Sequence, residues 1–262
     1  MTSIRPPAVA GTFYPADATA LRALIDQCMD DSVAPEPGAP VPDALVVPHA
    51  GLVYSGPVAA SAYRRLAPAR ADIGRVVLLG PSHHVPLRGL ALSTARAWQT
   101  PLGTVPVHFP AGVLDLGPVG TSDRAHAPEH SLEVQLPFLQ TVLDDFEIVP
   151  LLVGAADADE VATVIEHLWD GPDTVVVVST DLSHYHPYER ARELDARTAA
   201  AIVARRHADI TAEAACGAHP LRGLLRLADH KHLDVTSLDN RNSGDTAGDR
   251  SRVVGYGSFA LT

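Results

Sequence analysis

The feature that most constrains the fold of this chain is a set of four short runs in which almost every residue is apolar. They are residues 44–47 (ALVV), 76–79 (VVLL), 148–153 (IVPLLV) and 174–178 (TVVVV), and each is followed by Pro, Gly or Ser. A strand with one face in water alternates polar and apolar residues, whereas a strand covered on both faces does not. The runs are also too short for buried helices. We therefore predict an α/β fold with a central, mostly parallel sheet flanked by helices.

Segments with helical periodicity separate these runs. We predict helices over residues 17–29, from about Pro57, and over 132–143, 157–168, 188–205 and 221–230. Pro137 is expected to kink the third of these helices. Short β-like pieces at residues 90–93 and 105–109 are predicted as antiparallel additions to the sheet, and residues 234–239 and 251–261 as closing strands.

Composition narrows the class of protein. The net charge is −11, and the 20 Lys and Arg residues form no basic cluster, which argues against a nucleic-acid or anionic-membrane surface. Two cysteines, Cys28 and Cys216, cannot form a disulfide framework, so a reducing compartment is expected. The sequence has no apolar leader and no apolar window of membrane-spanning length. We therefore predict a soluble, cytoplasmic protein.

Three of the four apolar runs lead directly into histidines. His49 follows the first run, His83 and His84 follow the second, and His184 follows the fourth. The carboxyl ends of parallel strands meet at one edge of a sheet, where open α/β sheets bind ligands. Because consecutive βαβ strands usually lie side by side, we expect the strands before His49 and His83 to be neighbours. The pattern favours a shared metal or catalytic site over coincidence.

Imidazole is a ligand for Fe(II), zinc and copper, so His49 and His83 predict a metal site without identifying the metal. By residue type, the third ligand is to be sought among Cys216, Glu129, Glu133 and Asp181. His184 is a candidate general base, and Asp181 is placed to orient it or to bind substrate. The structural alternative is that Asp181 and Ser183 cap the following helix. From the residues alone, Cys216 is more simply a buried structural cysteine.

The segment PEHSLEVQLPF places Glu129, His130 and Glu133 at the predicted start of a helix. Two carboxylates and an imidazole in that arrangement are compatible with metal ligation or acid–base chemistry. They are equally compatible with acidic residues that complement the helix dipole. Serine-hydrolase elbows, P-loops, His-Glu-x-x-His and paired Cys-x-x-Cys motifs are absent from the sequence, which weakens those classes.

Five ordered motifs resemble the Memo family, whose bacterial and archaeal members are called AmmeMemoRadiSam system protein B. They are PHAG with Tyr54 close behind, LLGPSHHVPL, PEHSLEVQLPF, VVSTDLSH and CGAHPL. The resemblance covers nearly the whole chain and implies a single domain over residues 1–262, with a fold similar to class III extradiol ring-cleaving dioxygenases. It implies metal ligation by His49, His83 and Cys216, and it puts His184 in the position of the dioxygenase base beside Asp181. Further pocket residues implied by it are Tyr54, His84, Glu129 and His130.

The resemblance also implies a cofactor and a reaction class. Ring-cleaving enzymes complete the iron site with a carboxylate, where this chain has Cys216. Fe(II) is the first expectation, and the softer thiolate makes copper or zinc the alternatives. We accordingly predict a metal-dependent redox enzyme, dioxygenase-like, that acts on a small oxidisable substrate of unknown identity. The alternatives are a non-catalytic phosphopeptide-binding adaptor and a zinc-dependent hydrolase. The family name further implies association with an AMMECR-type protein and a radical-SAM protein.

Overall fold

The computed structural model describes residues 3–262 and contains two sheets. The larger sheet has nine strands in the order β10-β12-β2-β9-β3-β8-β4-β7, and β11 pairs with β12 off this path. Its strands are β2 (Ala44–Val47), β3 (Arg75–Pro81), β4 (Leu90–Leu92), β7 (Val119–Thr121), β8 (Glu147–Val153), β9 (Thr174–Ser179), β10 (His184–His186), β11 (Val235–Asn242) and β12 (Val253–Leu261). The smaller sheet contains β1 (Ile4–Arg5), β5 (Ala97–Thr100) and β6 (Gly103–Pro106).

The four apolar runs form the centre of the large sheet, as predicted, in the order β2-β9-β3-β8 with all three pairings parallel. Outside this centre, β12 runs antiparallel to β2, and β4 runs antiparallel to β8. The sheet as a whole is therefore mixed: parallel pairing is found among the central strands and between β4 and β7, and the expectation of a mostly parallel sheet does not hold for the rest. The expectation that β2 and β3 are neighbours is wrong, because β9 lies between them.

The predicted antiparallel additions differ in outcome. Residues 90–92 form β4 on the large sheet, with Leu90 opposite Val153. The segment near Val105 was wrongly assigned to that sheet: it forms β6, which pairs with β5 in a hairpin that places Val105 opposite Trp98. The turn between Thr100 and Gly103 gives β6 a local partner, and the segment reaches the large sheet only beyond β6, where Val107 forms a single bridge with Ile148 and the His108 N–H bonds to the Ile148 carbonyl.

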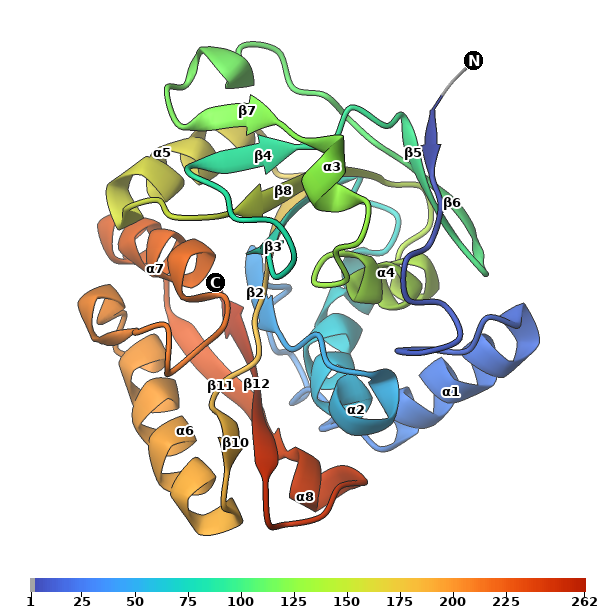
Figure 1. Ribbon diagram of the computed structural model, residues 1–262, viewed down its shortest axis with the longest axis vertical. Helices are drawn as coiled ribbons and strands as arrows, with labels where there is room; N and C mark the ends of the chain where they lie inside the picture. The colour runs from blue at the N-terminus through green and yellow to red at the C-terminus, as the bar shows by residue number, and fades with distance from the viewer. Residues whose placement is uncertain (1–2) are drawn as a thin grey trace.

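The helices lie on both faces of the sheet (Figure 1), with α1, α2 and α4 on one side and α5, α6 and α7 on the other. They are α1 (Ala18–Asp30), α2 (Leu52–Tyr63), α3 (Asp123–His126), α4 (Leu136–Val142), α5 (Ala158–Leu168), α6 (Tyr188–Val203), α7 (Ala218–Lys231) and α8 (Ser243–Thr246). Short 3-10 segments are η1 (Arg64–Ala69), η2 (Val113–Asp115), η3 (Glu133–Gln135) and η4 (His207–Asp209). Aspartates begin α1 and α5: Asp17 accepts from the Ala20 N–H, and Asp157 forms a capping box with Glu160.

Two helix boundaries correct the sequence-based expectations. The α2 helix begins at Leu52, so Pro57 lies inside it rather than at its start. The Leu52 N–H bonds to the carbonyl of Phe13, a contact with the N-terminal segment that the local sequence does not reveal. The α4 helix begins at Leu136, so Pro137 lies in its first turn, where a missing N–H breaks no helical bond and causes no kink.

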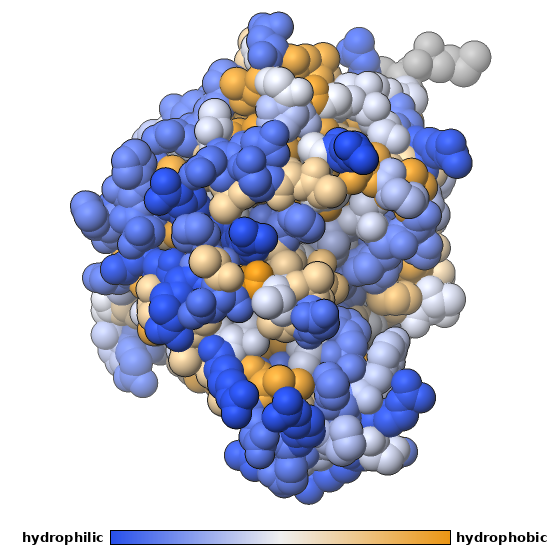
Figure 2. All heavy atoms as spheres, turned by 60° about the vertical axis from the view of Figure 1, so that its left-hand side comes forward, coloured by the Kyte–Doolittle hydropathy of each residue, from blue (hydrophilic) through white to orange (hydrophobic). Residues whose placement is uncertain are grey.

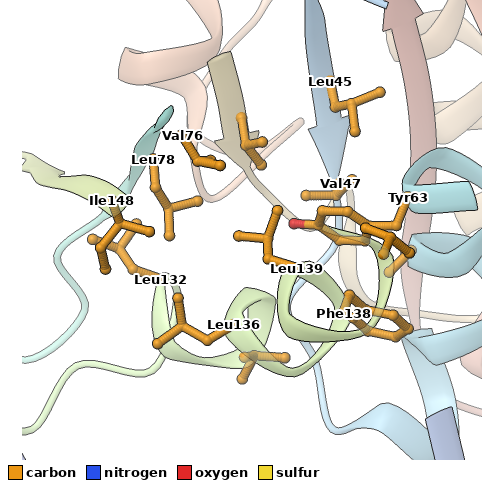
Figure 3. Close-up of a cluster of buried hydrophobic side chains, with 14 of the residues drawn as sticks. Leu45, Val47, Tyr63, Val76, Leu78, Leu132, Leu136, Phe138, Leu139 and Ile148 are labelled. Carbon is orange, nitrogen blue, oxygen red and sulfur yellow. The ribbon is translucent and has the colours of Figure 1, made fainter. Parts of the chain in front are cut away.

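The core consists of two apolar layers, one on each face of the sheet. Val76 and Leu78 of β3 point into the layer beneath α1, α2 and α4, whereas Val77 and Leu79 point into the layer beneath α5 and α7. Figure 3 shows the first layer, in which Leu136 and Leu139 of α4 face the sheet residues. Each fully buried aliphatic side chain stabilises the fold by about 1.5–3 kcal/mol, so both faces of the central strands must be apolar. This explains the unbroken apolar runs.

The outer surface is different in character. With the side of α5, α6 and α7 turned forward, Figure 2 shows a mainly hydrophilic face on which apolar atoms are scattered. Within residues 3–262, no helix combines the length and apolarity needed to cross a membrane.

Candidate metal centre

Three imidazoles meet at the carboxyl edge of the central strands. His49 follows β2, His83 follows β3, and His130 lies in the loop between α3 and η3. One ring nitrogen of each lies within 4.8 Å of the others. The His83 and His130 rings stack with centroids 4.7 Å apart, and the His49 ring lies 5.2 Å from that of His83. The family resemblance implied His130 as a pocket residue, and the fold makes it the third member of this imidazole cluster.

A small residue lets His49 and His83 meet although β9 separates their strands. Ser179, the last residue of β9, is fully buried, and its hydroxyl lies 2.8 Å from Nδ1 of His49. Adjacent strands are about 4.8 Å apart, so β2 and β3 are separated by roughly twice that distance. The two side chains cover the gap by converging over the end of β9.

The same serine fixes which nitrogen of His49 carries the proton. The Ser179 hydroxyl donates to the Ser131 carbonyl at 2.7 Å and accepts from Nε2 of Gln135 at 2.8 Å. A hydroxyl has one hydrogen, so toward His49 it acts as an acceptor. The proton of neutral His49 therefore lies on Nδ1, and Nε2 presents its lone pair to the cluster. Tyr63 in turn donates to Oε1 of Gln135 at 2.9 Å, which fixes the orientation of the amide.

Glu129 orients the other two imidazoles. Its Oε1 lies 2.9 Å from Nδ1 of His83 and 3.3 Å from Nδ1 of His130. It also accepts the backbone N–H groups of His83, His130 and Ser131. A carboxylate only accepts, so His83 donates from Nδ1 and keeps Nε2 free, the arrangement usual for metal-binding histidines. Glu129 thus holds the histidines in place and does not complement a helix dipole.

The protonation states suit a metal site. Burial, followed by the nearby charges of His83 and His130, holds the pKa of His49 well below its ordinary value. Burial likewise lowers the pKa of His130 to about 4. Burial alone would raise the pKa of Glu129, but the hydrogen bond from the His83 side chain and the surrounding N–H groups hold it well below its ordinary value. At neutral pH His49 and His130 are therefore neutral, and Glu129 is a charged carboxylate behind the cluster.

Cys216 lies at the edge of this cluster. Its Sγ is 3.3 Å from Nε2 of His49 and accepts the Asp181 N–H at 3.3 Å. It is not in the group of donors that lie within 4.8 Å of one another. Burial, and next the charge of Asp181, raises the pKa of the thiol to about 12, so Cys216 is protonated in this state. Its role as a ligand remains a prediction.

Asp181 and His184 follow β9 on the same side of the centre. Asp181 is buried and accepts the His49 N–H at 2.8 Å. It does not cap a helix, because the next helix, α6, begins at Tyr188 after Pro187. Burial raises the pKa of Asp181 to about 6 despite the backbone N–H bonds from His49 and Ala50. His184 places Nδ1 2.8 Å from the Leu182 carbonyl, which leaves its Nε2 as the basic nitrogen.

The centre opens into a cavity of about 610 Å³. Its walls carry four aromatic rings, from Phe13, Tyr54, Tyr185 and Tyr256. The cluster histidines, Asp181 and His184 lie on its surface. Tyr54, which the family resemblance implied as a pocket residue, lies on the cavity wall, whereas the described lining residues do not include His84. The His84 ring is exposed and lies 6.0 Å from the His130 ring.

A buried ion pair supports the Glu129 loop from below. Arg5 donates to Glu133 at 2.7 Å and to the carbonyls of His126 and Glu129 at 2.8 and 2.6 Å. Glu133 also accepts from Tyr14 at 2.6 Å and from the backbone N–H groups of Ala8 and Val9. The sequence presented Glu129 and Glu133 as one acidic cluster, but they have separate partners. Glu133 ties the N-terminal segment to the site, and Phe13 of that segment reaches the cavity.

Sequence reasoning missed several residues of this centre. Ser179 and Gln135 were not singled out, because a buried serine or glutamine has no characteristic spacing pattern. Tyr256 and Arg252 were missed as cavity residues because they lie in β12 and just before it, far from the histidine motifs in sequence, and Tyr185 was missed although it directly follows His184. The PEHSLEVQLPF segment, which contains Gln135, was the one available signal for that residue.

Comparison with known proteins identifies the family. Residues 5–260 match the family model described as "Memo-like protein". A MEMO1 family protein of Methanopyrus kandleri is 36% identical over 281 residues, covering 98% of each chain. One of Methanothermobacter thermautotrophicus is 36% identical over 277 residues, covering 97% of this chain and 98% of the relative. A crystal structure of an uncharacterized Escherichia coli K12 protein matches with a TM-score of 0.48 and 16% identity, over 82% of this chain and 98% of that chain. The chain belongs to the Memo-like protein family.

Proposed function

We propose that this protein is a metal-dependent redox enzyme, with Fe(II) as the first expected metal and copper as the second, acting on a small oxidisable aromatic substrate. One observation carries the proposal: nitrogens of His49, His83 and His130 lie within 4.8 Å of one another, and the three histidines line a 610 Å³ cavity. Their supporting hydrogen bonds put the proton on Nδ1, so Nε2 carries the lone pair in both His49 and His83, and Nε2 of His49 meets the Cys216 thiol at 3.3 Å. Neutral imidazoles held in this way suit Fe(II), copper and zinc.

The chain's own residues fit such a metal. His49 and His83 would hold it through Nε2, and the third ligand would be Cys216, as the family resemblance implies, or His130, as the cluster favours. A thiolate ligand requires the Cys216 proton to leave on metal binding, whereas His130 is already neutral. When bound, Fe(II) supplies one-electron redox chemistry.

Residues beside the metal would handle the substrate. His184 presents Nε2 to the cavity and would accept a proton from a substrate hydroxyl. Asp181 lies on the same surface, where its carboxylate would orient the substrate or stabilise protonated His184. The aromatic walls would pack against a ring and exclude water from it.

Metal analysis tests the proposal. Protein purified without air or chelator should contain stoichiometric iron or copper, and the double variant His49→Ala/His83→Ala should lose it. The exposed neighbour His84 provides the control, because His84→Ala should keep the wild-type metal content. A protein free of iron and copper, or a double variant that retains them, would contradict the proposal.

The third ligand is identified by two single variants. Cys216→Ser and His130→Gln each remove one candidate donor while keeping a polar side chain in its place. The variant with the larger loss of metal affinity identifies the ligand. A Cys216 ligand also predicts a sulfur-to-metal charge-transfer band in the Cu(II) form that Cys216→Ser abolishes and His130→Gln retains.

A zinc hydrolase is the second candidate, because a set of three histidines is a known catalytic zinc site. His184 would then act as the base toward a zinc-bound water. Turnover of ester or amide substrates by the zinc form, but not by the iron form, would favour this function over the redox enzyme.

A further inference from the structure

The mouth of the cavity contains a cation that the proposed chemistry does not use. Arg252 lies on the cavity wall beside Tyr185, and the centre of its guanidinium is 5.1 Å from the centroid of the tyrosine ring. The Tyr185 ring in turn lies 5.7 Å from that of His184. The positive charge is thus one aromatic side chain away from the candidate base.

An irregularity in the sheet puts Tyr185 in this place. The pairing of β10 with β12 shifts register between His184 and His186, so Tyr185 is the extra residue of a bulge. Its φ of 61° is left-handed, an unfavourable conformation for a tyrosine, and its side chain is 63% exposed. Strained residues of this kind gather at functional sites. Burial does not account for the conformation, since the side chain faces solvent at the cavity mouth.

Arg252 also lacks a neutralising partner. Among residues 3–262, no carboxylate oxygen lies within 4.0 Å of its guanidinium nitrogens, in contrast to Arg5, Arg70 and Arg75, which form ion pairs. Asp249 lines the same cavity, but both its oxygens accept from Ser251. Among the described lining residues, Arg252 alone carries a permanent positive charge. Its donors are available to an incoming anion.

We infer that Arg252, stacked on Tyr185, forms an anion-binding subsite that selects small aromatic carboxylates as ligands of the cavity. The four aromatic walls would hold the ring, and Arg252 would pair with the carboxylate while the opposite end of the ring points to the imidazole cluster. A singly charged carboxylate fits better than a phosphate dianion, because Asp249 and Asp181 lie in the same cavity and the chain has a net charge of −11. The assignment of the ligand as substrate rests on the proposed function.

Calorimetric titration tests the subsite by binding rather than turnover. The anaerobic holoprotein is titrated with 3,4-dihydroxybenzoate, with its neutral amide 3,4-dihydroxybenzamide and with phenyl phosphate. The acid should bind about 10-fold to 100-fold more tightly than the amide, as expected for a charge-assisted hydrogen bond. Arg252→Gln should weaken binding of the acid by that factor and leave binding of the amide unchanged. The affinity of Arg252→Lys for the acid should lie between those of the wild type and Arg252→Gln.

The matched control is Arg250→Gln, because Arg250 stacks on Tyr188 instead and its change should leave both affinities unaltered. Equal affinity for acid and amide, no saturable binding of the acid, or an unaffected Arg252→Gln variant would overturn the subsite. Tighter binding of phenyl phosphate than of the acid would overturn the carboxylate assignment. Metal content measured on the same samples separates the two proposals: a metal-free protein refutes the redox function, while the ratio of acid to amide affinity still reports on Arg252.

Discussion

The buried floor of the metal centre and the exposed rim of its cavity hold their polar groups in different ways. The floor, which consists of His49, Ser179, Gln135 and Asp181, is at most 4% exposed, and each side chain has hydrogen-bond partners within the protein. The rim, which consists of Tyr54, Tyr185 and Arg252, is exposed, and the Arg252 guanidinium lies over the Tyr185 ring. Changes in the floor should therefore alter stability and metal affinity together, whereas changes in the rim should alter ligand choice alone.

The largest loss of unfolding free energy is expected at Glu133, which lies beneath the floor. Glu133→Ala leaves Arg5 buried without its ion pair and removes the acceptor of Tyr14. Loss of one partner of a buried pair costs about 3–5 kcal/mol, which denaturant unfolding measures. Glu189→Ala is the control: it removes a surface pair with Arg192 and should change the unfolding free energy by less than about 0.5 kcal/mol. Similar losses in the two variants would remove the distinction between buried support and surface.

The pH dependence of the unfolding free energy should identify His126 as a second buried group that stabilises the fold. Burial lowers its pKa to about 4, while Nε2 donates to the Ala91 carbonyl. The unfolded chain binds this proton near pH 6.5 and the folded chain only near pH 4, so stability falls as pH drops through that window, by about 3 kcal/mol in total. His126→Gln keeps a donor and cannot titrate, so its unfolding free energy should fall less between pH 6.5 and pH 4. Identical slopes in the metal-free proteins would disprove this assignment.

An intermediate effect is expected in the floor itself, at Ser179. Ser179→Ala removes the acceptor that keeps the proton on Nδ1 of His49, and loss of such a supporting contact typically reduces metal affinity about 10-fold to 100-fold. Competition with a chelator measures the change. Ser258→Ala is a matched control, because Ser258 is equally buried and its hydroxyl has no partner among the described residues. An unchanged metal affinity in Ser179→Ala would show that this hydrogen bond does not set the tautomer.

The smallest effect on stability is expected at the rim. Tyr185→Gly relieves the left-handed conformation and should leave the unfolding free energy unchanged or raise it by up to about 1 kcal/mol, while weakening binding of the aromatic carboxylate. At the neighbouring His186, which has no positive φ, the same change to glycine should destabilise the strand by about 0.5–1 kcal/mol. A stability loss above 1 kcal/mol in Tyr185→Gly would assign this tyrosine to the folded framework instead of the ligand site.

The central sheet was predictable from sequence because both faces of its strands are buried. Residues 44–47 and 175–178 cannot alternate in polarity when each side chain enters one of two apolar layers. The histidines that follow could also be placed at one edge, since the carboxyl ends of parallel strands coincide. The order of the strands was not predictable in the same way: nothing in the run before His49 specifies that β9, over 120 residues later, lies between it and β3.

The make-up of the site was only partly predictable. The types of residue that bind metals can be read from the sequence, which indicated His49 and His83 as candidate ligands, and the family resemblance implied His130 as a pocket residue. The supporting contacts cannot be read from the sequence, because the role of the Ser179 hydroxyl depends on the partners that the fold places beside it. The same holds for Arg252. The sequence shows the arginine, but only the fold places it beside Tyr185 on the cavity wall.

By itself, the amino-acid sequence determined the elements of this protein and the kind of chemistry open to it, because local pattern controls burial and residue type controls ligation. The tertiary structure alone decided which imidazoles converge, which nitrogen His49 and His83 present, and that Arg252 lies at the cavity mouth. Those outcomes depend on distances between segments far apart in the chain, and such distances are set by packing rather than by local sequence.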